Sequence, residues 1–239
     1  MKDRNLSVKL PIDNLAGLWP GELKKAAIGA LLHPASVTST LAHSLDVLWS
    51  LNGDRFELKC LFGPQHGFLG ETQDNMIEWN GFNHAELRVP VYSLYGKDRE
   101  PTEEMLSGLD AMVVDLQDVG ARYYTFIWTM YLCMRACEQK GIPVIVLDRP
   151  NPINAITTEG PLLSPDYRSF VGLHPIPARH GMTMGQLAEK FKLEAFPNCE
   201  IRVLHMENWK PDLWFDETGL PWVSPSPNMP TLDTATVYP

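Results

Sequence analysis

Short, almost wholly apolar runs recur along this chain and alternate with stretches of helical spacing. The runs lie at residues 26–32, 56–62, 89–94, 110–116, 143–147 and 201–204. Strands that read as continuous apolar runs are covered on both faces, which is typical of a parallel sheet between layers of helices. The pattern therefore predicts an α/β fold with a doubly wound, mostly parallel sheet.

Helices are expected between these runs, at residues 38–51, 102–109, 124–140 and 183–191. Thr102 and Thr183 are the residue type that caps a helix N-terminus. Gly141, followed by Pro143, is a typical stop signal for the helix before it. Each predicted helix thus has the length and position of a crossover between two strands.

The C-terminal part of the chain has a different composition. Prolines recur there, at Pro211, Pro221, Pro225, Pro227, Pro230 and Pro239. Proline lacks a backbone donor and clashes within a helix, while three tryptophans in the same part argue against disorder. We expect an ordered, extended proline-rich segment on the surface. Residues 1–239 are interpreted as a single domain.

The overall charge restricts the partners that this chain can bind. The 239 residues carry a formal net charge of -9 and are 44% hydrophobic, with a sequence pI near 5.2. An acidic chain lacks the positive surface that attracts nucleic acid or anionic membranes, so neither is expected as a partner. The first residues show no leader peptide, which leaves two localisations open: the cytoplasm, or a compartment reached with a leader since removed.

Cofactor and metal signals are weak. The phosphate-binding patterns GxxxxGK[ST] and GxGxxG do not occur, so no nucleotide cofactor is expected. The four cysteines, Cys60, Cys133, Cys137 and Cys199, are not matched by histidines at zinc-site spacing. Buried free thiols are favoured over a disulfide or a metal site. No cofactor and no metal are therefore predicted.

Polar, glycine-rich loops follow three of the predicted strands. They span residues 63–71, 117–125 and 148–152. In an open parallel sheet, ligands bind outside the carboxyl ends of the strands. We expect these loops to converge there, and their candidate site residues are Gln65, His66, Glu71, Asp118, Arg122, Tyr124, Asp148, Arg149 and Asn151.

Each candidate also has a purely structural interpretation. His66 suits an acid, a base or a sugar-binding donor, or it bonds a neighbouring loop. Glu71 is a candidate carboxylate or a solvated loop residue. Arg122 offers a planar fork for a carboxylate, or it forms an ion pair with an aspartate that orients the loop. Tyr124 stacks on a sugar ring or packs in the core.

Two further candidates come later in the chain. Glu159 is a second carboxylate of the kind that glycosidases need. His180 precedes a predicted helix and either lines the same cleft or caps that helix. Asp148, Arg149 and Asn151 either hold substrate hydroxyl or amide groups or end their strand, where Pro150 and Pro152 fix the local backbone.

Read together, these motifs resemble the exo-β-N-acetylmuramidase family, formerly a domain of unknown function. The matching stretches are residues 62–68 (FGPQHGF), 115–125 (DLQDVGARYYT), 146–152 (VLDRPNP), 159–161 (EGP), 179–183 (RHGMT) and 225–231 (PSPNMPT). The resemblance implies a Rossmann-like N-terminal domain and a smaller C-terminal domain, which is not evident here. It also implies release of N-acetylmuramic acid, a small sugar, from the non-reducing end of peptidoglycan fragments in cell-wall recycling, without a cofactor.

The sequence departs from the family pattern at one position. The family reads Pro-Glu-His-Gly where this chain has Gln65, and an amide supplies neither a proton nor an anionic base. A glycosidase interpretation therefore assigns the carboxyl chemistry to Glu159 with Glu71 or Asp118, assisted by His66, while Arg122 binds the lactyl carboxylate. The alternative is a catalytically silent module that binds muramic acid. In either case a C-terminal domain or a partner chain is expected to complete the cleft.

Overall fold

The computed structural model describes residues 7–70 and 77–239, which contain a seven-stranded sheet. The strands are β1 (Ala26–Leu31), β2 (Phe56–Gly63), β3 (Phe82–Asn83), β4 (Pro90–Ser93), β5 (Ala111–Val114), β6 (Val144–Leu147) and β7 (Ile201–Leu204). Their order is β3-β4-β2-β1-β5-β6-β7, and only the short edge strand β3 pairs antiparallel within this described sheet. The predicted doubly wound, Rossmann-like α/β fold is confirmed.

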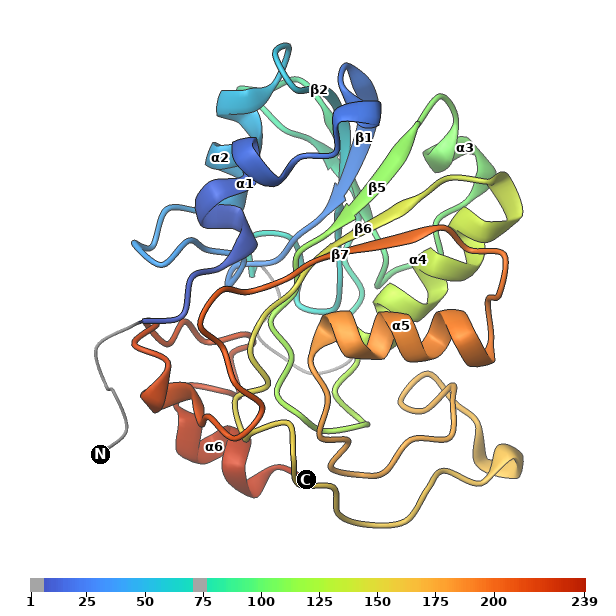
Figure 1. Cartoon of the computed structure of the whole chain (residues 1–239). Coiled ribbons are helices and arrows are strands. Elements are labelled where there is room, and N and C mark those ends of the chain that lie inside the picture. The colour runs from blue at the N-terminus through green and yellow to red at the C-terminus, as the bar shows by residue number, and fades with distance from the viewer. Residues whose placement is uncertain (1–6, 71–76) are drawn as a thin grey trace.

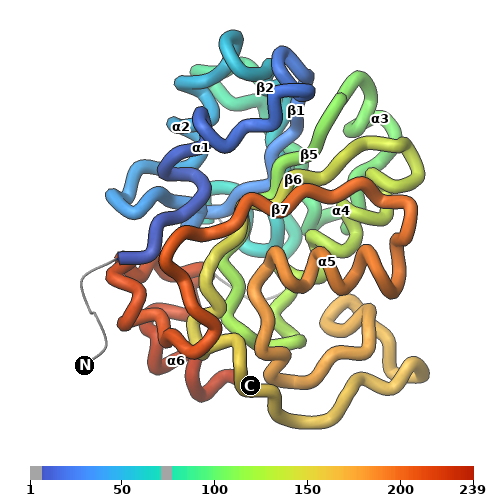
Figure 2. The backbone as a smooth tube through the Cα atoms, viewed as in Figure 1, coloured from blue at the N-terminus to red at the C-terminus, as the bar shows by residue number. Residues whose placement is uncertain are grey.

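Helices cover both faces of the sheet, as Figures 1 and 2 show. They are α1 (Leu15–Leu18), α2 (Ser44–Leu51), α3 (Glu103–Leu106), α4 (Phe126–Lys140), α5 (Met184–Glu194) and α6 (Leu232–Val237). One hydrophobic core lies under α1 and α2 and contains Leu15 and Leu48. The other lies under α4 and α5 and contains Trp128 and Leu187. The strands supply both cores because their side chains are buried on both faces.

The predicted N-caps of two helices and the predicted stop of a third are confirmed by their local geometry. Thr102 and Thr183 each accept a hydrogen bond from the backbone N–H three residues later. Gly141 ends α4 in the left-handed region with φ 66°, a conformation that glycine adopts without strain. The helix expected from residue 38 begins instead at Ser44, because the Thr38 hydroxyl accepts the N–H of Ala42 and holds a turn there.

An extended C-terminal segment is not observed over its whole length. Phe215–Glu217 form a 3-10 turn and Leu232–Val237 form α6. Thr231 caps α6 by accepting the N–H of Thr234. The prediction of an extended segment rested on the prolines and overlooked this N-cap residue. The segment packs against the carboxyl edge of the sheet, at the bottom of Figure 1, where Ala235 is fully buried.

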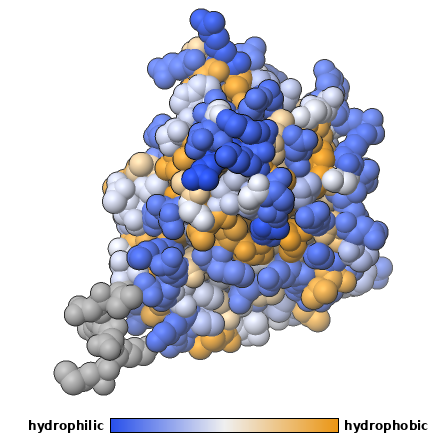
Figure 3. All heavy atoms as spheres, turned by 45° about the horizontal axis from the view of Figure 1, so that its top comes forward, coloured by the Kyte–Doolittle hydropathy of each residue, from blue (hydrophilic) through white to orange (hydrophobic). Residues whose placement is uncertain are grey.

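The outer surface is mainly polar where the strands begin. Figure 3 tilts the top of Figure 1 forward and shows hydrophilic residues over most of that side, with hydrophobic residues in small groups between them. Within residues 7–70 and 77–239, no helix has the length and apolarity needed to cross a bilayer.

Candidate active site

The order of the strands reverses between β1 and β5. From β1 the chain adds strands on one side, β2 and β4, and from β5 it adds β6 and β7 on the other. Such a reversal is where open α/β sheets bind ligands, at the carboxyl ends of the strands. His33, just after β1, and Gln117, just after β5, meet here, and the Gln117 N–H donates to His33 Nε2 at 2.9 Å.

His33 is a neutral hydrogen-bond acceptor at this reversal of strand order. It is fully buried, and burial together with the nearby Arg149 charge holds its pKa well below the ordinary range. The bond that it accepts from Gln117 fixes Nε2 as the unprotonated nitrogen. His33 was not a predicted site residue, and a lone histidine after an apolar run gives no sequence signal of this role.

The three polar loops are joined by hydrogen bonds. Thr125 Oγ1 donates to Gln65 Oε1 at 2.8 Å, linking the loop after β2 to the N-terminus of α4. Gln117 Nε2 donates to Pro150 O at 2.9 Å, linking the loops after β5 and β6. The structure therefore places the loops of Gln65, Asp118 and Asp148 on one edge of the sheet, as the sequence predicted.

Backbone strain marks the loop after β2. His66 has φ 72° and Gly67 has φ 90°. A histidine in the left-handed region is uncommon, and such strain is often kept where a side chain must be aimed. Both Gln65 and His66 are buried, at 9% and 6% exposure. Glu71, the other candidate from this loop, lies outside the described residues.

Asp118 and His180 form a buried pair. Asp118 Oδ2 accepts the Gly120 N–H at 2.6 Å and lies 2.9 Å from His180 Nε2. The Met182 N–H donates to His180 Nδ1 at 3.2 Å, so the proton of a neutral His180 sits on Nε2 and points at Asp118. His180 does not cap α5, because Thr183 does.

The polar side chains after β6 form hydrogen bonds with other residues of the chain. Arg149 binds Asp115 through two nitrogens, at 2.5 and 2.9 Å, and donates to Val37 O. Asn151 donates to Met182 O and accepts the Ile153 N–H. These bonds match the structural alternative stated for the loop after β6, namely that its polar residues end and fix the strand.

Asp148 is held at the N-terminus of α5. Its carboxylate accepts bonds from Thr183 Oγ1 and the Gly185 and Arg149 N–H groups. Burial nevertheless raises the pKa of Asp148 to about 6, because desolvation outweighs these bonds.

Two predicted residues lie farther out. Glu159 is 64% exposed in its side chain and pairs with Arg179 at 2.7 Å. Arg122 Nη1 donates to two backbone carbonyls, Pro161 O and Ile176 O, both at 2.7 Å. The aspartate partner considered for Arg122 is not observed within the described residues, since Asp118 pairs with His180 and Asp115 with Arg149.

A small cavity of about 70 Å³ lies at the carboxyl edge. It is lined by Gln65, His66, Tyr123, Tyr124, Thr125, Phe126, Ser226, Asn228, Met229 and Tyr238. Sequence reasoning found Gln65, His66 and Tyr124. It did not single out Phe126, Ser226, Met229 or Tyr238, although residues 225–231 belong to the motifs quoted above. Contacts between a loop and a distant C-terminal segment are not visible in a single sequence.

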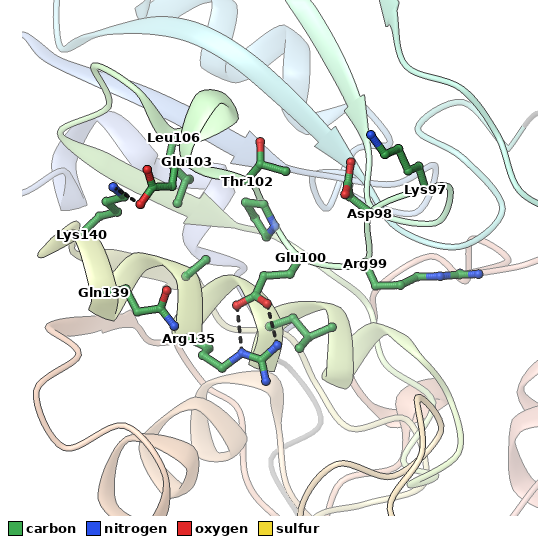
Figure 4. A pocket seen from close by; sticks show the side chains of 13 residues that line it. Lys97, Asp98, Arg99, Glu100, Thr102, Glu103, Leu106, Arg135, Gln139 and Lys140 are labelled. Atoms are coloured by element: carbon green, nitrogen blue, oxygen red, sulfur yellow. Dashed lines mark hydrogen bonds and ion pairs between the residues drawn. The ribbon is translucent and has the colours of Figure 1, made fainter.

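A larger groove of about 450 Å³ lies between residues 97–103 and the C-terminal half of α4 (Figure 4). Its charges neutralise one another: Glu100 pairs with Arg135, and Glu103 with Lys140 at 2.6 Å. The groove is open and partly exposed, and no polar side chain that lines it is fully buried. It lacks the desolvated, convergent groups of the small cavity, so we place the candidate site at the latter.

The potential metal ligands are dispersed, and the thiols are buried, in the described part of the chain. No group of three or more His, Cys, Asp or Glu side chains among them is arranged to hold a metal ion. All four cysteines are free and buried, as expected from the sequence.

The fold and the site together define an α/β domain whose polar loops gather at the switch point of a parallel sheet. The chain belongs to the family described as "Exo-beta-N-acetylmuramidase NamZ, N-terminal", whose model matches residues 28–233.

Known relatives agree with this family membership. The chain is 47% identical over 232 residues to the peptidoglycan beta-N-acetylmuramidase NamZ of Bacillus subtilis (strain 168), covering 97% of the chain and 55% of that protein. Two crystal structures of DUF1343 family proteins from Bacteroides fragilis NCTC 9343 superpose with TM-scores of 0.87 and 0.80, at 35% and 32% identity. They cover 98% of this chain, which spans 59% and 60% of theirs. The chain thus spans little more than half the length of these relatives.

Proposed function

We propose that this chain is the N-terminal domain of a β-N-acetylmuramidase that releases N-acetylmuramic acid from the non-reducing end of peptidoglycan fragments. The 47% identity to a curated peptidoglycan β-N-acetylmuramidase supports it. The observation that carries it is the cavity at the carboxyl edge of the sheet, which is lined by strained His66, buried Gln65 and Tyr124. A C-terminal domain or a partner chain then completes the cleft.

The proposed acid and base groups are the carboxylates that the sequence singled out. Glycoside hydrolysis usually needs two carboxyl groups beside the scissile bond. Glu71 and Glu159 are the proposed carboxylates, with His66 assisting, and Asp118, Arg122 and Tyr124 belong to substrate binding. The Glu159 side chain is 64% exposed and accessible to a substrate, and its ion-pair partner Arg179 is 13% exposed.

Gln65 supports a second candidate, a silent module that binds muramic acid. The Thr125 hydroxyl holds the Gln65 side chain in the cavity wall, where an amide cannot carry a proton for catalysis. Such a module binds N-acetylmuramic acid and forms no product.

Hydrolysis of a chromogenic N-acetylmuramide tests both candidates. We expect turnover by the native two-domain protein that contains this chain, and at least about 100-fold faster turnover by its Gln65→Glu variant, the usual range for a general acid or base. Gln139→Glu, an exposed position at the end of α4, adds the same charge away from the site and serves as the control.

Each outcome of this assay separates the candidates. Turnover by the native protein rejects the silent module. Turnover by Gln65→Glu alone, together with calorimetric binding by the native chain, establishes the silent module. No turnover by either protein rejects the enzyme.

A further inference from the structure

Thr125 uses its hydroxyl differently from the threonines that precede α3, α5 and α6. Thr102, Thr183 and Thr231 have extended backbones, and each accepts a backbone N–H of its own helix. Thr125 comes directly before α4, but its backbone is helical, with φ -72° and ψ -14°, and its side chain makes no such cap. Its hydroxyl donates instead to Gln65 Oε1 at 2.8 Å. Thr125 therefore bonds the loop after β2 and not its own helix.

The bond between Thr125 and Gln65 is shielded from water. Thr125 is 8% exposed and Gln65 9%, and both line the small cavity at the carboxyl edge. Because water competes little for such a bond, it restricts the Gln65 side chain to one orientation. The backbone beside Gln65 is fixed as well, since Pro64 O accepts the Gly67 N–H at 3.2 Å and the Trp79 indole N–H at 3.0 Å. The Gln65 side chain is thus held at both of its ends.

The direction of this bond decides which end of the Gln65 amide is available. A glutamine amide has an acceptor oxygen at one end and two N–H donors at the other. The Thr125 hydroxyl donates, so it holds the oxygen end at the N-terminus of α4. The amide nitrogen, Nε2, is then the end that Gln65 can offer to a ligand in the cavity that it lines. A ligand atom that meets Gln65 is therefore an acceptor.

The rest of the lining favours an uncharged acceptor. No Asp, Glu, Lys or Arg is among the described residues that line the cavity. A carboxylate would lose its hydration there without gaining a counter-charge. The N-terminus of α4 is the positive end of a helix dipole, which favours the partial negative charge of an oxygen atom. A volume of about 70 Å³, roughly that of two liquid waters, admits one hydroxyl or carbonyl group and not a sugar ring.

We infer that Thr125 is a positioning residue, which holds Gln65 as an oriented donor to a hydroxyl or carbonyl oxygen of the bound sugar. Thr125 acts through the Gln65 amide and does not itself need to contact the sugar. The inference rests on the proposed function and deepens it, because it gives Gln65 a binding role that requires no ionisable group.

Calorimetric binding of N-acetylmuramic acid to the two-domain protein that contains this chain tests the inference. Thr125→Val keeps the shape of the side chain and removes the hydroxyl, and we expect it to weaken binding about 3- to 10-fold. Thr125→Ser retains the donor and should bind within about twofold of the native protein. Gln65→Met keeps the length of the side chain without its amide, and adding Thr125→Val to it should change the affinity by less than about twofold.

Thr129→Val is the matched control. Thr129 is fully buried one turn further along α4, its hydroxyl donates to Thr125 O, and it is not among the residues that line the cavity. Its loss should change binding by less than about twofold, and thermal unfolding of every variant checks that the fold is kept.

Two results would overturn the positioning role and leave the proposed function standing. One is an equal loss of affinity from Thr125→Val in the native and Gln65→Met backgrounds, since independent sites give additive losses. The other is a loss in Thr125→Ser as large as that in Thr125→Val. Absence of binding by the native protein contradicts both the positioning role and the proposed function.

Discussion

Arg149 and Asp115 form a two-pronged ion pair in the interior of the protein, with N–O distances of 2.5 and 2.9 Å. Their side chains are 4% and 1% exposed. Ser44 Oγ, at the start of α2, donates to the same carboxylate at 2.6 Å. The pair therefore ties the ends of β5 and β6 to the helix layer behind β1.

Removing one partner of this pair should destabilise the protein strongly. Arg149→Met leaves the Asp115 carboxylate buried without its counter-charge, and we expect a loss of about 3–5 kcal/mol in the free energy of unfolding. Arg135→Met is the control, because the Arg135–Glu100 pair is exposed and should contribute only about 0–1 kcal/mol. Urea unfolding measures both. Equal losses would show that burial of the Arg149 pair does not matter.

Asp148 should make stability depend on pH in an unusual direction. Burial raises its pKa from 3.8 to about 6 in the fold, so the folded protein keeps this proton to a higher pH than the unfolded chain. Between about pH 4 and 6 the unfolded chain ionises first, and folding stability falls as the pH rises. The group's contribution falls by about 3 kcal/mol over this range and is constant above it.

Asp148→Asn removes this titration and keeps a side chain of the same shape. Urea unfolding at pH 4, 5, 6 and 7 should show native stability falling relative to the variant up to about pH 6 and levelling off beyond. If the native protein instead gains stability relative to Asp148→Asn as the pH rises from 4 to 6, the pKa of Asp148 is lowered in the fold.

Gly63 should not tolerate a side chain. A Cβ at this position would lie 2.6 Å from the Trp79 ring and 2.8 Å from the Phe68 nitrogen. We expect Gly63→Ala to cost about 1–3 kcal/mol and to alter Trp79 fluorescence, because the Trp79 indole also donates to Pro64 O in the same loop. Gly21→Ala has open space around it and should leave stability within about 1 kcal/mol. A matching small effect at Gly63 would contradict the close packing.

The cysteines should resist alkylation in the folded protein. Burial raises the pKa of Cys60 to about 12 and that of Cys199 to about 11, and those of Cys133 and Cys137 as well. The thiolate is the reactive form, so iodoacetamide at pH 8 should label none of the four until the protein is denatured. Intact mass spectrometry reads the result, and rapid labelling of the folded protein would contradict the burial.

The sheet was predictable from the sequence because its strands are buried on both faces, so their apolar runs are nearly continuous. The edge strand β3 was not, since two exposed residues, Phe82 and Asn83, give no pattern. The start of α2 was misplaced because the Thr38 side chain competes with helix formation.

The candidate site was only partly predictable. Parallel topology brings Gln65, Asp118 and Asp148 to one edge, and this convergence followed from the parallel direction of the predicted strands. The hydrogen-bond partners of these side chains could not be predicted, because they come from residues far apart in the sequence. Thr125 bonds to Gln65, and His180 to Asp118. The part played by Tyr238 required the fold itself, since α6 brings it back over Tyr123 and Tyr124.

The hydrogen bonds that join the three polar loops to one another have a thermodynamic consequence. Because these loops are already held by their own hydrogen bonds, their backbone loses little conformational entropy when a sugar binds. Titration calorimetry at several temperatures should then yield a heat-capacity change set by the small apolar area that the ligand covers, without the large negative value that accompanies coupled folding.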